Sequence, residues 1–111
     1  MDIYAYRSDV VVPEDLAGYD VEALDGSIGK VDEATKEAQS GYLVVDTGFW
    51  IFGKKRMIPF GVARGIDARS ETVQVGMTKD QIKSAPDFDE VRRRNEDYRR
   101  EVGDYYSRYN S

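Results

Sequence analysis

The chain has 111 residues, 41% of them hydrophobic and 33% charged, and its 16 basic and 21 acidic side chains give a net charge of −5. This length suits one domain, and the absence of cysteine and histidine excludes disulfides, thiolate chemistry, Ser-His-Asp triads and histidine-based metal sites. The negative charge disfavours general nucleic-acid binding, which needs a basic surface. We therefore predict a protein that is not an enzyme and carries no catalytic residues, cofactor or metal ion.

The sequence contains no run that approaches the ~20 apolar residues of a membrane-spanning helix. Its opening residues, Met1 to Arg7, lack the basic-then-apolar order of a signal peptide. These features predict a cytoplasmic protein with no integral membrane segment.

The N-terminal part of the chain predicts two short elements. Residues 3–7 alternate weakly between apolar and polar side chains, which favours a short edge strand. Pro13 to Leu16 predicts a single helical turn, because proline is tolerated at the first helical position. Gly18 then ends this turn.

From residue 19 to residue 77 the pattern predicts strands joined by short turns. Asp25-Gly26 indicates a hairpin between strands near 21–24 and 28–31. The β-branched run over 42–45 predicts a buried strand. A strand near 56–60 contains Pro59, which places it at a sheet edge or a strand end. After a polar turn at 69–71, Val73, Val75 and Met77 recur with the period of two of a half-buried strand. This spacing favours a small antiparallel β-barrel.

The C-terminal part of the chain predicts two helices. Thr78 and Gln81 match a capping box, which starts a short helix that ends near residues 84–86. A longer helix of about 22 residues is expected from Asp87, because apolar and aromatic residues follow with alternating spacings of three and four.

Several blocks in this order resemble a PRC-barrel domain: Leu16-x-Gly18-x-x-Val21-x-x-x-Asp25-Gly26-x-Ile28-Gly29-Lys30-Val31, then Tyr42-Leu43-Val44-Val45-Asp46, then Met57-Ile58-Pro59. The segment from Thr78 to Pro86 is similar to the one that often closes such domains in bacteria. The resemblance implies a small antiparallel PRC-type β-barrel with a C-terminal α-helical extension. We divide the chain into an N-terminal segment (1–13), the barrel-like domain (14–86) and the C-terminal helix (87–111).

What the resemblance implies for function is a non-enzymatic protein–protein interaction or assembly module. The family includes the cytoplasmic domain of the photosynthetic reaction-centre H subunit and the C-terminal domain of a ribosome maturation factor, and related barrels occur in cell-division adaptors. It carries no shared catalytic residues. The identity of the partner does not follow from the sequence.

The aromatic segment between two predicted strands is the first candidate interaction site. It offers Phe49, Trp50 and Phe52, and side chains of an extended segment alternate between two faces, so they cannot all enter one core. Aromatic residues are favoured anchors at interfaces. The alternative is that they plug one end of the barrel.

The stripe along the C-terminal helix is the second candidate, for self-association into a homodimer. It comprises Val91, Asn95, Tyr98, Val102 and Tyr105. Packing of this stripe on the chain's own barrel is an equally good interpretation. The arginines at 92–94 and 99–100 leave a third possibility, an RNA-associated accessory module, although a solvated helix face is the simpler explanation.

Overall fold

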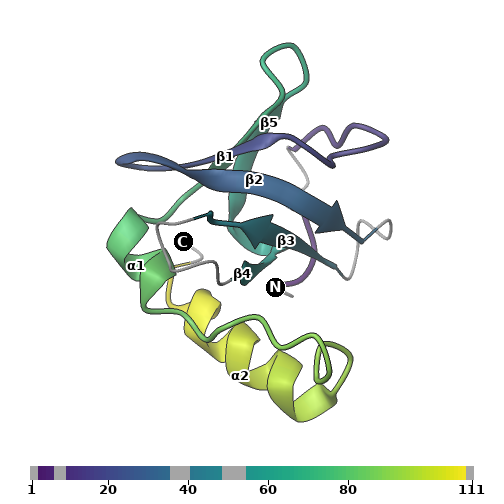
Figure 1. The fold of residues 1–111 in the computed structure, drawn as a ribbon, viewed down its shortest axis with the longest axis vertical. Helices are drawn as coiled ribbons and strands as arrows, with labels where there is room; N and C mark the ends of the chain where they lie inside the picture. Colours follow the sequence, from purple (N-terminus) through teal and green to yellow (C-terminus); the bar gives the residue numbers. More distant parts are fainter. Residues whose placement is uncertain (1–2, 7–9, 36–40, 49–54, 110–111) are drawn as a thin grey trace.

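A computed structural model describes residues 3–6, 10–35, 41–48 and 55–109 of the chain. The described residues form six strands and two α-helices (Figure 1). The strands are β1 (Asp20–Ala23), β2 (Gly26–Ala34), β3 (Tyr42–Asp46), β4 (Lys55–Pro59), β5 (Ala63–Asp67) and β6 (Thr72–Val75). The 3-10 turn η1 (Phe60–Val62) joins β4 to β5, and α1 (Lys79–Lys83) and α2 (Glu96–Ser107) complete the chain.

The six strands form one mixed sheet in the order β4-β3-β2-β1-β6-β5. A mainly β fold with a C-terminal helix is therefore confirmed, but the expected all-antiparallel sheet is wrong at one pair, because β1 runs parallel to β6. β4 and β5 are the two edges of the sheet, yet only the three residues of η1 separate them in sequence. The sheet must therefore curl until its opposite edges meet at η1, although the described strands do not close it into a barrel.

The β1–β2 hairpin forms one residue away from the predicted position. Ala23 pairs with Gly26, so the two turn residues are Leu24 and Asp25 rather than Asp25 and Gly26. The positive φ of 140° falls on Gly26, at the start of β2, where glycine alone adopts it without strain. Pro59 ends the edge strand β4, as its missing N–H predicts.

The N-terminal segment is held by the sheet without joining it as a strand. Residues 3–6 form a turn, so the predicted edge strand is wrong there. The Ile3 and Tyr4 carbonyls accept hydrogen bonds from the Gly61 and Gly41 N–H groups, at 2.6 and 2.7 Å. A Cβ on Gly61 would lie 2.3 Å from the Ile3 carbonyl oxygen, so this close approach requires glycine.

The predicted helical turn at Pro13 to Leu16 is also absent. One oxygen of the Asp15 carboxylate accepts a 3.0 Å hydrogen bond from the Ala17 N–H. Such side-chain bonds offer the backbone an alternative to helix. The segment is irregular, with a bend at Glu14, and it lines one cleft together with the end of β2.

The capping box at the start of α1 is confirmed. The Gln81 N–H donates to the Thr78 hydroxyl, and the Thr78 N–H donates to the Gln81 side chain. The helix ends at Lys83, with Ser84 as its C-cap.

The C-terminal helix begins nine residues later than predicted, at Glu96. Asn95 is its N-cap, with the side-chain oxygen accepting from the Asp97 and Tyr98 N–H groups. Asp89 holds the preceding turn in the same way, accepting from the Val91 and Arg92 N–H groups. Residues 90–94 therefore form turns, because asparagine and aspartate satisfy free backbone donors better at helix starts than inside helices.

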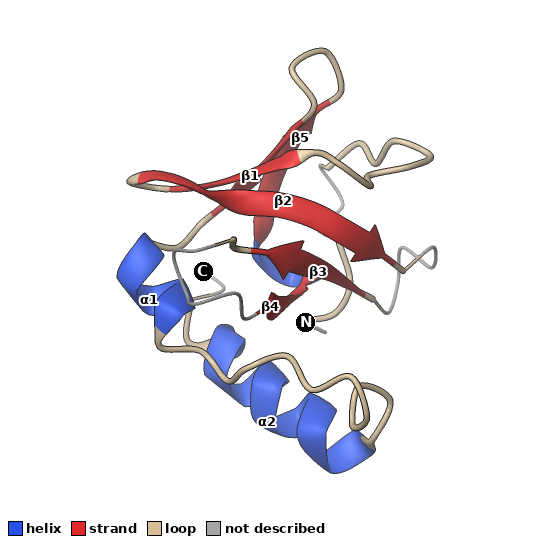
Figure 2. Cartoon of the chain, viewed as in Figure 1, coloured by secondary structure: helices blue, strands red, loops and turns tan. Residues whose placement is uncertain are grey.

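Both helices lie on the β4 side of the sheet and complete a single core (Figure 2). Tyr98, Val102 and Tyr106 of α2 are buried in the same cluster as Ile3, Tyr4 and the inward-facing residues of the strands. Neither helix in the described part of the chain is long and apolar enough to span a membrane.

A buried arginine on β4 links the sheet to both helical segments. The Arg56 side chain is 3% exposed, and its guanidinium donates to the Ile82 and Lys83 carbonyls at the end of α1, at 3.1 and 2.9 Å. It also donates to the Lys55 carbonyl at 3.2 Å and to the Asp87 carboxylate at 2.6 Å. One planar group thus satisfies the last carbonyls of α1 and fixes the chain leading to α2.

Replacing this arginine tests its role. We expect Arg56→Met to lower the free energy of unfolding by about 2–4 kcal/mol, because the partly buried Lys83 carbonyl and the other acceptors lose the guanidinium donor. Arg100→Met is the matched control, because Arg100 is exposed and, among the described residues, forms an ion pair with the exposed Asp97; its effect should stay within about 0.5 kcal/mol. Urea unfolding measures both. Equal effects would contradict the assignment.

Removing the C-terminal segment tests whether α2 belongs to the core. A chain that ends at Ala85 loses three buried side chains, each contributing roughly 1.5–3 kcal/mol, and this loss is comparable to the whole stability of a small domain. We expect no cooperative thermal transition by far-UV circular dichroism. A truncated chain that melts within a few degrees of the full chain would place α2 outside the core.

Candidate functional site

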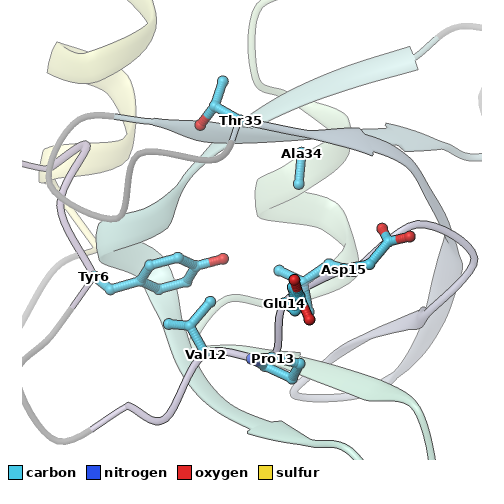
Figure 3. Close-up of a pocket in the computed structure, with 8 residues that line it drawn as sticks. Tyr6, Val12, Pro13, Glu14, Asp15, Ala34 and Thr35 are labelled. Atoms are coloured by element: carbon cyan, nitrogen blue, oxygen red, sulfur yellow. The ribbon is translucent and has the colours of Figure 1, made fainter.

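A cleft of about 490 Å³ lies between the N-terminal segment and the end of β2. Figure 3 shows Tyr6 and Val12 of the N-terminal segment on one side of the cleft and Ala34 of β2 pointing toward them, while the Thr35 side chain points away from the Tyr6 ring. The complete described lining is Tyr6, Val12, Pro13, Glu14, Asp15, Leu16, Ala34 and Thr35.

The wall formed by Tyr6 is fixed by the core. Its ring stacks on Phe60 of η1, with ring centroids 3.9 Å apart and an interplanar angle of 14°. The carbonyls of Ile3 and Tyr4 are held by backbone hydrogen bonds just before it. The opposite end of the segment is held by Leu16, which is buried in the core. The cleft is therefore built between two anchored points of the chain.

The hydroxyl of Tyr6 is buried and has no hydrogen-bond partner among the residues that the structure describes. Figure 3 shows it pointing toward the space in front of Glu14 and Ala34. Burial raises the pKa of Tyr6 above its ordinary value, so the hydroxyl stays protonated at neutral pH. A buried hydroxyl without a partner costs about 1–3 kcal/mol, which makes this group exceptional in the lining.

The rim of the cleft is acidic. Glu14 and Asp15 are both exposed and line the cleft, and one Asp15 oxygen already accepts from the Ala17 N–H. The Thr35 hydroxyl accepts from the Tyr42 N–H at 3.1 Å. The described lining therefore combines apolar side chains, two carboxylates and an unpaired hydroxyl, and it contains no basic residue.

The described residues contain no group of three acidic side chains that could hold a metal ion. The Tyr6 hydroxyl and the carboxylates of Glu14 and Asp15 can therefore hydrogen-bond to a ligand or attract a positively charged group, but these described groups do not form a metal-coordination shell.

The aromatic residues predicted as protein-interaction anchors, Phe49, Trp50 and Phe52, lie outside the described residues. Their role stays a prediction.

The predicted self-association stripe is not one continuous helix face. Val91 lies in a turn and is 94% exposed, whereas Asn95 is the N-cap of α2. Tyr98 and Val102 are buried in this chain's own core, and the Tyr105 hydroxyl donates to the Gln81 carbonyl. The chain therefore uses most of this stripe internally, as the alternative interpretation allowed, while self-association itself stays a prediction.

The arginines beside this stripe are engaged by tyrosines and carboxylates. Arg93 donates to the Tyr42 hydroxyl and to the Glu33 and Glu90 carboxylates. The hydrogen bond with Glu33 is the main reason that the pKa of Arg93 is raised. The Arg99 guanidinium lies 4.4 Å from the centre of the Tyr4 ring, a cation–π contact.

The sequence patterns miss Tyr6 and Glu14. Tyr6 belongs to a segment predicted as a strand, and Glu14 to a predicted helical turn, so neither was expected at a site. The signal available was weak: an exposed apolar run, Val10 to Pro13, stands beside two acidic residues.

Comparisons with protein families and curated proteins do not assign a function to the cleft. No protein-family model matches the chain, and no curated protein is detectably similar to it. Any functional statement must therefore come from the chain's own residues.

The two buried, unpaired tyrosine hydroxyls, of Tyr6 and Tyr106, predict a loss of stability at high pH. Burial raises both pKa values above the ordinary value of 10.0. Above about pH 10 the unfolded chain releases these protons and the folded chain keeps them, so stability falls as pH rises, by about 1.4 kcal/mol per pH unit and tyrosine.

We expect Tyr106→Phe to match the parent chain or exceed it in stability at pH 7 and to lose less stability between pH 9 and 11. Denaturant unfolding at each pH measures the difference. Parallel stability curves for the two proteins would contradict the burial of a neutral hydroxyl.

Proposed function

We propose that this chain is a non-enzymatic, PRC-barrel-like module for protein–protein interaction or assembly, acting in the cytoplasm. The barrel-like part of the proposal is supported by the curled sheet, whose edge strands β4 and β5 are joined by only three residues. Because η1 joins the two edge strands, the sheet curls toward closure, as the sheet of a small barrel does when its edge strands meet.

The observation that carries the interaction role is the cleft beside Tyr6. It combines apolar surface with a few polar groups on a scaffold held by backbone hydrogen bonds, the composition typical of ligand-binding pockets, and a side chain of a partner protein can fill such a pocket. Its volume of about 490 Å³ falls within the roughly 300–1,000 Å³ of such sites.

The RNA-binding alternative has less support. Arg93 is held by two carboxylates and Arg99 by aromatic rings, so both are used to attach α2 and the preceding turn to the sheet. Arg92, Arg94 and Arg100 remain exposed, but acidic residues surround them in the sequence and the chain is negative overall. Such a surface attracts phosphates weakly.

The experiment is a selection of a random peptide library on the immobilised full chain. We expect enrichment of a short consensus over a control selection on the heat-denatured chain. The same chain should not bind single-stranded RNA in a filter assay at low salt, where phosphate contacts are strongest. Absence of any enriched consensus, or salt-dependent RNA binding, would contradict the proposal.

The contribution of the aromatic segment is tested with Trp50→Ala in the same selection. If Trp50 is an anchor, the variant should lose the consensus while its far-UV circular dichroism and melting temperature stay nearly unchanged, because interface anchors add little to folding. A large loss of stability would place the indole in the core instead.

A further inference from the structure

The described lining of the cleft beside Tyr6 contains two carboxylates and no cationic side chain. Glu14 carries a carboxylate that has no hydrogen-bond or ion-pair partner among the described residues. Asp15 adds a second carboxylate, and the described lining supplies no cation to balance either. A cationic ligand group is the complement of such a rim.

The inner part of the cleft suits an aliphatic chain that ends in a hydrogen-bond donor. Val12, Pro13 and Ala34 present apolar surface, and the lone pairs of the Tyr6 hydroxyl oxygen accept no hydrogen bond from the described residues. The oxygen is closed to solvent, so a ligand reaches it only by seating in the cleft and shifting the side chains in front of it. Val12, itself exposed, is one of the lining side chains that would shift.

We propose that this cleft binds a lysine side chain of a partner protein, with its aliphatic chain against Val12, Pro13 and Ala34. The ammonium lies between the Glu14 carboxylate and the Tyr6 hydroxyl. The ligand thus gives the unpaired Tyr6 hydroxyl oxygen a donor and balances the charge of the Glu14 carboxylate.

Lysine fits better than arginine because of the number of acceptors. Beside the proposed ammonium the cleft offers the Glu14 carboxylate and the Tyr6 oxygen, whereas the Asp15 carboxylate points away from the Tyr6 ring in Figure 3. A compact ammonium has three donors, whereas the planar guanidinium has five in a fixed fork. Burying the fork here would leave donors unpaired, which is costly.

This inference rests on the proposed interaction role, since it names the group that the partner supplies. The two fail separately. A peptide consensus without lysine, together with no binding of a lysine probe, overturns the inference and leaves the interaction role standing. Binding of the lysine probe without any peptide consensus leaves the lysine site standing and overturns the proposed interaction role.

The experiment is an NMR titration of the isotope-labelled full chain with Nα-acetyl-lysine N-methylamide. The matched probes are the norleucine analogue, which keeps the aliphatic chain without the charge, and the arginine analogue. We expect the lysine probe to shift the amide signals of Tyr6, Glu14 and Thr35 and to bind at least about fivefold more tightly than either analogue.

Two pairs of variants locate the contacts. Glu14→Gln should weaken lysine binding about fivefold or more, whereas Glu22→Gln, at another exposed acidic residue, should leave it unchanged. Tyr6→Phe should also weaken binding, and Tyr106→Phe should not, because Tyr106 is fully buried in the core and absent from the cleft lining. Melting temperatures of all four confirm that each variant is folded.

Four results would overturn the proposal: no binding of the lysine probe, equal binding of the norleucine analogue, tighter binding of the arginine analogue, or equal effects of Glu14→Gln and Glu22→Gln. Unchanged binding by Tyr6→Phe would remove the hydroxyl from the site and overturn the placement of the ammonium.

Discussion

The guanidinium of Arg56 is the buried charge on which the arrangement of sheet and helices depends. Its side chain comes from the edge strand β4, while its acceptors come from the end of α1 and from Asp87, on the way to α2. A charge removed from water must be hydrogen-bonded to be tolerated, so α1 and the following residues have one position in which this requirement is met. In that position the chain after α1 lies along the edge of β4, where the Phe88 N–H donates to the Lys55 carbonyl. An uncovered strand edge would present unpaired backbone groups to other chains.

The helix α2 extends the same constraint across the molecule. The Tyr98 hydroxyl donates to the Asp87 carbonyl and accepts from the Asp89 N–H, so the turn before α2 is fastened to the helix itself. Tyr4 then reaches from the N-terminal segment to the Arg99 carbonyl at 2.6 Å. Ile3 and Tyr4 are thereby held between α2 and η1, and the position of Tyr6, with the cleft in front of it, follows from contacts made nearly a hundred residues away in sequence.

Local patterns predicted the parts of the fold that local chemistry controls. The strand over 42–46, the edge position of Pro59 and the capping box of Thr78 and Gln81 all depend on neighbouring residues, and each was found as expected. The long helix from Asp87 was not found, because the spacing of apolar residues says nothing about where a helix starts. Asn95 and Asp89 decided that by capping free N–H groups. The cleft could not be predicted, since its walls come from segments that were expected to be a strand and a helical turn.

The amino-acid sequence by itself determined that the chain would form a mainly β domain with a helical C-terminus, because hydrophobic periodicity and turn residues act over a few positions. It also determined the net charge of −5 and the absence of thiol and imidazole chemistry. Only the tertiary structure decided that Tyr98 and Val102 serve the chain's own core, that β1 and β6 run parallel, and that an unpaired Tyr6 hydroxyl faces an acidic rim. These features depend on contacts between distant segments, whose partners are chosen by packing and by the need to satisfy buried polar groups.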